Sequence, residues 1–124
     1  MNNLAIKSRL SGSLLIIFVN DRQISELNYR FKRRLASTDV LAFDLAFKPK
    51  AKYVEGEIYV NLQAAQRQAS EYRVSYEEET ARLCVHGMLH LIGYDDHHPS
   101  DRKKMWQIQE KCVKGKFNGF KRQR

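Results

Sequence analysis

The sequence contains few cysteines and no long hydrophobic segment, and each absence excludes a class of protein. Two cysteines occur among 124 residues, Cys84 and Cys112, which excludes the dense disulfide framework of a small secreted domain and is typical of reduced thiols in the cytoplasm. The most apolar run, residues 14–19, is too short to cross a membrane or to form a signal-peptide core. We interpret it as a buried strand, and we expect a cytoplasmic protein with no membrane partner.

Acidic residues are also scarce relative to basic ones. The chain has 14 aspartates and glutamates against 22 lysines and arginines, so its formal net charge is +8. A basic domain attracts anionic partners, and nucleic acid is the commonest of these because each phosphate contact releases counterions. The charge therefore favours nucleic-acid binding, and solubility alone is the plain alternative.

Strand and helix patterns alternate along a chain whose length suits one hydrophobic core. Asn20 is a typical cap for the first helix, whose inner face should carry Ile24, Leu27 and Phe31. We predict strands at 14–19, 40–45 and 57–61 and helices at 21–31, 62–72, 76–91 and 100–113. This order predicts one α+β domain, residues 1–113, around a sheet of mixed strand direction. We expect residues 114–124 to form a basic, mobile tail.

The helix predicted at 76–91 carries two histidines. Ser75 and Glu78 form a capping-box pattern at its start, and Gly93 follows its end. His86 and His90 are separated by four residues, so they lie about 40° apart around the helix and share one face. Two neutral imidazoles in this arrangement can bind one metal ion, as in a zincin helix. The alternative is a pair of core histidines hydrogen-bonded to backbone carbonyls.

A third metal ligand could come from the loop after this helix. Gly93 can turn the chain back, and the loop then offers Asp96, His97 and His98 in succession. We expect Asp96 to be the ligand, with His97 as the alternative, because His98 precedes Pro99 and is biased towards an extended conformation. Three protein ligands would leave one coordination position open, which is typical of a catalytic site.

Glycine stands directly after the first histidine. A zincin protease has glutamate there as its general base, so Gly87 argues against peptide hydrolysis. Glycine also lowers helix stability, which suggests that something approaches the helix closely at this position. Either a ligand or the sheet could do so.

Three segments resemble the YbeY family of metal-dependent endoribonucleases. They are HGMLHLIGYD beginning at His86, STDVLAF beginning at Ser37 and GEI beginning at Gly56. The resemblance covers about residues 14–113. It implies a mixed four-stranded sheet packed with helices, one zinc-like divalent metal ion, and cleavage of single-stranded RNA. It also implies action in ribosomal RNA maturation at the 3′ end of the small-subunit RNA, in ribosome quality control, and with protein partners on the ribosome.

The chain departs from the family pattern at four positions. Asp96 stands where the family has its third histidine, Lys32 where arginine is usual, Ser37 for proline and Glu57 for aspartate. A carboxylate can bind zinc, but it lowers the net charge of the site. Lysine keeps the positive charge but lacks the bidentate geometry that arginine offers to phosphate.

Aromatic and cationic residues alternate before the STDVLAF segment. Tyr29 and Phe31 suit stacking on bases, and the neighbouring cations suit phosphates. The RNA-binding residues that we predict are Arg30, Lys32, Arg33 and Arg34. A solvated helix end is the alternative. The leading hypothesis is a metal-dependent endoribonuclease with His86, His90 and Lys32 as catalytic residues, and the alternative is a metal-stabilised RNA- or ribosome-binding factor with little or no cleavage activity.

Overall fold

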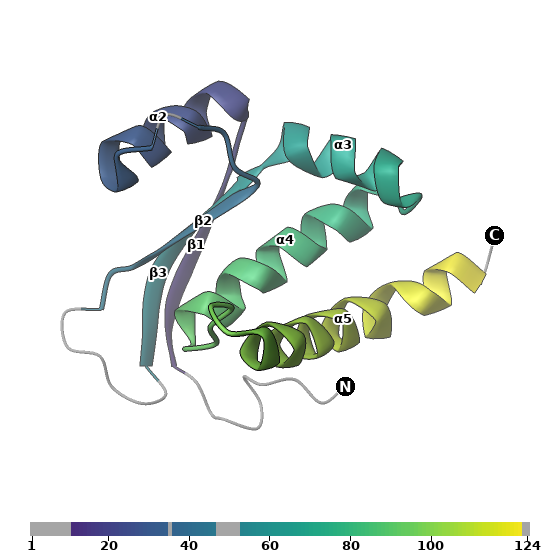
Figure 1. Ribbon diagram of the computed structural model, residues 1–124. Coiled ribbons are helices and arrows are strands. Elements are labelled where there is room, and N and C mark those ends of the chain that lie inside the picture. Colours follow the sequence, from purple (N-terminus) through teal and green to yellow (C-terminus); the bar gives the residue numbers. More distant parts are fainter. Residues whose placement is uncertain (1–10, 35, 47–52, 123–124) are drawn as a thin grey trace.

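The computed structural model describes residues 11–34, 36–46 and 53–122, which form an α+β fold with four helices (Figure 1). The elements are β1 (Ser11–Val19), α2 (Asp21–Lys32), β2 (Val40–Asp44), β3 (Tyr53–Asn61), α3 (Leu62–Tyr72), α4 (Tyr76–Leu91) and α5 (Pro99–Arg122). Within these ranges, no helix has both the length and the apolar character needed to span a membrane.

The sheet has the strand order β1-β3-β2. β1 runs parallel to β3, with Val19 opposite Asn61, and β2 runs antiparallel to β3, with Val40 opposite Val60. The predicted mixed direction is therefore confirmed. The described ranges hold three strands, so the four-stranded sheet that the family resemblance implies is not confirmed.

Helices cover both faces of the sheet, because the strands present apolar side chains on both. On one face, Ile24 of α2 packs with Val19 and Leu41. On the other face, Leu83 of α4 packs with Ile58 and Val60, and Ala65 of α3 joins this cluster. α5 lies along the far side of α4 (Figure 1). α2, the sheet, and the pair α3 and α4 thus form three layers around β3, the central strand, and α5 packs on α4.

Three predictions about these elements were wrong. Residues 14–19 were expected to form a buried strand, but β1 lies at the edge of the sheet formed by the described residues, and its Leu15 is 57% and its Phe18 52% exposed. The exposure of these side chains follows from the position of β1 in the sheet, because α4 contacts β2 and β3. Phe31 was expected on the inner face of α2 but is 59% exposed, contacting the Phe43 ring edge to face. The last helix was expected to end at residue 113, but α5 continues to Arg122.

The C-terminal tail and the segment between β2 and β3 are described only in part. The residues Pro49, Lys50 and Lys52 of that segment lie outside the described residues. The domain limit at residue 113 and the mobility of residues 114–124 stay predictions.

Polar side chains join the elements at the carboxyl ends of the parallel strands. Asn61, which is fully buried, caps α3 and donates from Nδ2 to Asp21 Oδ1 at 2.7 Å and to the Thr38 carbonyl at 3.1 Å. Arg67 of α3 donates two hydrogen bonds to Asp21, at 2.8 and 2.9 Å. The guanidinium of Arg67 and the amide of Asn61 hold the pKa of Asp21 well below its usual range. These bonds fix the start of α2 against α3 and the segment before β2.

Close packing of α4 on the sheet explains Gly87. A Cβ built at this position would lie 2.7 Å from Ile58 Cγ2 and 3.3 Å from Val40 Cγ2. Atoms at such distances repel strongly, so no larger side chain fits unless the helix or the strand moves. Of the two explanations for this glycine, contact with the sheet is therefore the one that the structure supports.

We expect Gly87→Ala to lower the free energy of unfolding by about 1–2 kcal/mol, because overpacking outweighs the gain in helix propensity. Gly115→Ala is the matched control, since a Cβ at this α5 position meets nothing within 4 Å. The control should raise stability by up to about 1 kcal/mol. Urea denaturation measures both variants, and a Gly87→Ala protein as stable as the wild type would contradict the packing argument.

Candidate metal centre

Helix α4 begins with the serine cap and ends with the glycine turn that its sequence predicts. Ser75 Oγ accepts a hydrogen bond from the Glu78 N–H at 3.0 Å. At the other end the Gly93 N–H donates to the His90 carbonyl at 3.2 Å, and the Tyr94 N–H donates to the Leu89 carbonyl at 3.0 Å. This is a Schellman turn, and Gly93 provides the left-handed backbone, φ +107°, that it requires. The turn directs the following loop back alongside α4.

The two histidines of α4 direct their Nε2 atoms towards one point. His86 Nε2 and His90 Nε2 are 3.1 Å apart, and the two rings are nearly perpendicular, at 81°. Two imidazole nitrogens at tetrahedral positions around one zinc ion lie about 3.3 Å apart, given Zn–N distances near 2.0–2.1 Å. The pair therefore has the separation that shared coordination requires.

The loop brings a carboxylate to the same point. Asp96 Oδ2 lies 3.7 Å from His90 Nε2, and one ligand atom from each of His86, His90 and Asp96 lies within 4.8 Å of the others. All three side chains are partly buried. The structure thus brings together the three residues that the sequence spacing selects as a metal site.

The other two loop histidines lie away from this group. The side chain of His97 is 83% exposed, and its Nε2 lies 3.6 Å from Asp95 Oδ1. With Asp95 and Asp96 it forms a second cluster of donor atoms that is more exposed than the first. His98 is exposed, and its carbonyl accepts from the Arg102 N–H at 2.9 Å, in the first turn of α5.

The surroundings of His90 favour a neutral imidazole. Burial lowers the pKa of His90, and the neighbouring His86 adds to this effect, while Asp96 and the Tyr94 backbone act against them. A neutral ring keeps the lone pair that a metal ion needs. Cys84 packs with the core cluster beside the sheet, and burial raises the pKa of its thiol.

A polar network behind His86 was not predicted from the sequence. Gln109 of α5 places Oε1 2.7 Å from His86 Nδ1, and its neighbour Glu110 is bound by Arg82 of α4. Arg82 also binds Glu78 and Glu79, and all three carboxylate side chains are at most 9% exposed. The spacing of Glu78 and Arg82, four residues apart on one helix, was the available signal. Gln109 and Glu110 lie on another helix, so no short spacing in the sequence links them to His86 or Arg82.

Burial would raise the pKa of Glu110, but the hydrogen bonds from Arg82 and Gln109 outweigh it and hold the pKa below its usual value. Glu79 differs, because there burial outweighs the bond to Arg82 and raises the pKa. Glu110 is therefore a carboxylate at neutral pH, and it accepts hydrogen bonds without donating any.

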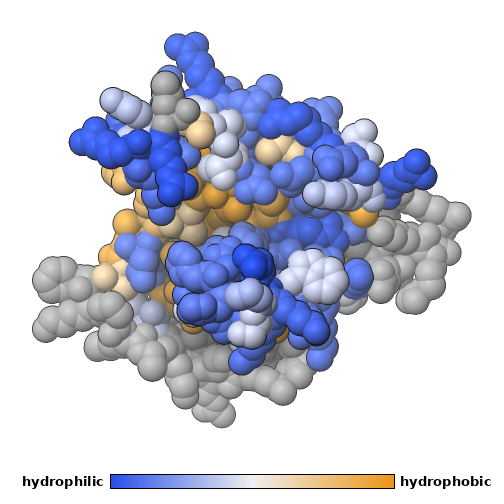
Figure 2. Space-filling view, in the orientation of Figure 1, coloured by the Kyte–Doolittle hydropathy of each residue, from blue (hydrophilic) through white to orange (hydrophobic). Residues whose placement is uncertain are grey.

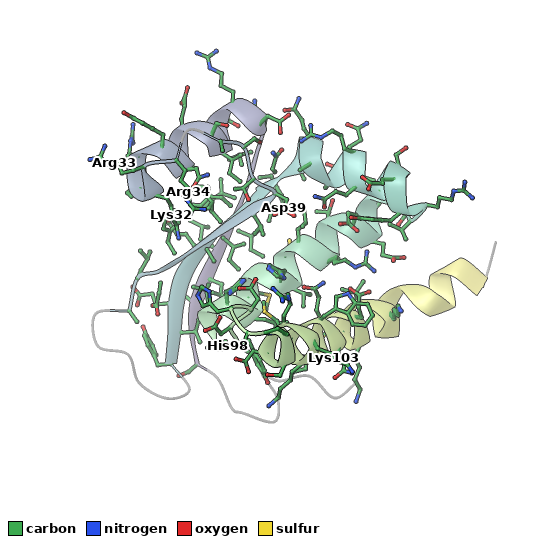
Figure 3. All side chains as sticks on the ribbon, viewed as in Figure 1. Lys32, Arg33, Arg34, Asp39, His98 and Lys103 are labelled. Atoms are coloured by element: carbon green, nitrogen blue, oxygen red, sulfur yellow. The ribbon has the colours of Figure 1, made fainter. Side chains whose placement is uncertain are left out.

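The basic residues predicted to bind RNA lie at the end of α2. Arg30, Lys32, Arg33 and Arg34 are all exposed, and Arg33 ends the helix in a left-handed conformation, φ 57°. Lys32 and Arg34 line a pocket of about 310 Å³ with Asn28, Ser37 and Thr38 among others. Both lie on the side of α2 that faces the loop carrying His98 (Figure 3).

Between α2 and α5 the surface is hollowed. Figure 2 shows a hydrophobic floor between two strongly hydrophilic rims on this face.

The model of the protein family described as Endoribonuclease YbeY matches residues 1–116. The chain belongs to the YbeY family.

Individual YbeY relatives match most of this chain. "Endoribonuclease YbeY" of Pelotomaculum thermopropionicum is 40% identical over 108 residues, which is 83% of this chain and 70% of that protein. The Myxococcus xanthus protein of the same name is 37% identical over 112 residues, 87% of this chain but 38% of its own length. A solution structure of a Thermotoga maritima protein has a TM-score of 0.67 and 30% identity, covering 96% of this chain and 77% of that one.

We expect Arg82→Met to lower the free energy of unfolding by about 3 kcal/mol, because three shielded carboxylates lose their common counter-charge. Arg22→Met is the control, since Arg22 and its partner Glu26 are both largely exposed and such pairs contribute less than about 1 kcal/mol. Urea denaturation near pH 7 measures both. Equal effects of the two substitutions would show that the Arg82 network does not stabilise the contact between α4 and α5.

Proposed function

We propose that this YbeY-family chain is a metal-dependent endoribonuclease that cleaves single-stranded RNA. Its substrate would be ribosomal RNA, in maturation of the 3′ end of the small-subunit RNA and in ribosome quality control. The convergence of His86 Nε2, His90 Nε2 and Asp96 Oδ2 carries the proposal. The net charge of +8 supports an RNA substrate, and the names of the relatives support the reaction class.

The donor set suits a zinc ion. Two imidazole nitrogens and one carboxylate oxygen are ligands that zinc accepts, and a set of three leaves a coordination position for substrate or water. We assign His86, His90 and Asp96 as the ligands, with His97 as the alternative to Asp96. Bound there, the ion would supply Lewis-acid chemistry for phosphodiester hydrolysis.

The basic end of α2 would hold the RNA. Arg30, Lys32, Arg33 and Arg34 are positioned to contact phosphates, and Lys32 is the residue to which we assign stabilisation of the charge that develops on the reacting phosphate. Tyr29 and Phe31 are 51% and 59% exposed, so they are accessible for base stacking. These cations lie at a helix C-terminus, which itself favours positive charge, so their abundance has a structural reason as well.

Peptide hydrolysis has no support at this site. In zincin proteases the general base follows the first histidine directly, and here that position is Gly87. A side chain there would meet Ile58 and Val40 on the sheet. The geometry therefore leaves no room for a protease-type glutamate.

A metal-stabilised RNA- or ribosome-binding factor with little cleavage is the second candidate. Asp96 favours it, because this carboxylate replaces the third histidine of the family pattern and would make the metal a weaker Lewis acid. In either case we expect the protein to act in the cytoplasm, on the ribosome and with ribosome-associated proteins.

Cleavage assays on zinc-loaded protein separate these candidates. We expect hydrolysis of a labelled single-stranded RNA, little hydrolysis of the same strand in a duplex, and a loss of at least about 100-fold in His86→Ala, since removing one of three ligands removes metal catalysis. His98→Ala is the matched control and should stay within about twofold, because that side chain is exposed and lies outside the proposed ligand group. RNA binding without cleavage would favour the binding factor, and cleavage that survives in His86→Ala would refute the proposed site.

A further inference from the structure

The first histidine of α4 has a partner on α5, Gln109, whose orientation is determined by its own neighbours. His86 Nδ1 lies 2.7 Å from Gln109 Oε1, and Gln109 is 7% exposed. An amide side chain can present either its oxygen or its NH₂ group, so the contact alone does not define which atom carries the hydrogen. The neighbours of Gln109 resolve this point.

Glu110 orients the amide. Gln109 Nε2 lies 3.1 Å from Glu110 Oε2. A carboxylate only accepts hydrogen bonds, so the NH₂ group of Gln109 must face Glu110 and the amide oxygen must face His86. The reverse orientation would place two acceptor oxygens against each other in a shielded region, which is costly.

Arg82 in turn holds Glu110. Its Nε donates to Glu110 Oε2 at 2.8 Å and its Nη2 to Oε1 at 2.9 Å, a bidentate pair of the strongest kind in proteins. The side chains are 16% and 9% exposed. Arg82 is fixed to its own helix by Glu78 and Glu79. The chain of contacts therefore runs from α4 to α5 and back to the histidine on α4.

We infer that Gln109 is a positioning residue that keeps His86 protonated at Nδ1, so that the lone pair on Nε2 points to the site shared with His90. An acceptor at 2.7 Å requires a donor opposite it, and Nδ1–H is the donor available on a neutral ring. The remaining nitrogen is then unprotonated and faces His90 Nε2 at 3.1 Å. The importance of this tautomer for metal binding rests on the proposed function, whereas the tautomer itself does not.

The neutral amide also suits the charge of its surroundings. A glutamate at position 109 would put a second carboxylate beside Glu110, near Glu78 and Glu79. Glutamine offers the same acceptor atom to His86 without adding to this negative charge. Histidine ligands of metals commonly donate their second N–H to an acceptor, and losing that acceptor typically weakens metal binding by about 10–100-fold.

Nitrogen NMR on the metal-free protein tests the tautomer directly. Long-range ¹H–¹⁵N spectra at about pH 8.5, above the ordinary histidine range, distinguish a protonated Nδ1 from a protonated Nε2. We expect Nδ1–H at His86 in the wild type and in Gln109→Glu, which keeps an acceptor oxygen. We expect a shift towards Nε2–H in Gln109→Met, which is similar in size and offers no comparable acceptor.

Zinc affinity is the second readout, measured by competition with a chelator. Gln109→Met should bind zinc about 10–100-fold more weakly, while Gln107→Leu, an exposed position on the same helix, should leave both readouts unchanged. Circular dichroism checks the fold, and Gln109→Ala replaces the methionine variant if that one does not fold. An unchanged His86 tautomer together with unchanged zinc affinity would overturn the inference. A wild type with the expected tautomer but no zinc binding would refute the proposed function alone.

Discussion

Helix α4 touches the central strand at Gly87, where there is no room for a side chain between the helix and Ile58. This contact sets both the depth of the helix and its rotation about its own axis. Successive residues on a helix are separated by about 100°, so once Gly87 faces the sheet, His86 and His90 lie about 100° and about 60° from it on the same flank of the helix. The rotation that closes the packing therefore presents both imidazoles together. A shift of α4 large enough to admit a side chain at Gly87 would also move the pair.

The other parts of the site follow from how α4 ends and from what lies beside it. The Schellman turn at Gly93 reverses the chain within a few residues, and Asp96 thereby reaches the histidines. α5 then packs along α4 and contributes Gln109 behind His86. Arg82 neutralises the shielded carboxylates of Glu78, Glu79 and Glu110 from within the fold, while four exposed cations lie at the end of α2. Under the proposed function, an anionic substrate would meet this basic rim.

Local features of the sequence were sufficient to predict most elements and the three side chains that converge at the end of α4. Asn20 and Ser75 cap the helices that they were expected to cap, and the histidine spacing places its two side chains on one face. Features that depend on tertiary neighbours could not be predicted. The apolar composition of β1 suggests burial, but strand order puts β1 at an edge. Gln109 and Glu110 read as ordinary polar helix residues, because their partners are more than 20 positions away in the chain.

X-ray absorption spectroscopy of the zinc-loaded protein tests the central claim, which is that one ion is shared by two α4 imidazoles and a loop carboxylate. We expect a four-coordinate ion with nitrogen and oxygen ligands at about 2.0–2.2 Å and scattering from two imidazole rings. Asp96→His, measured in parallel, should add a third ring. A wild-type spectrum with three imidazoles would assign a loop histidine in place of Asp96. Sulfur at about 2.3 Å, or fewer than two imidazoles, would contradict the site built on His86 and His90.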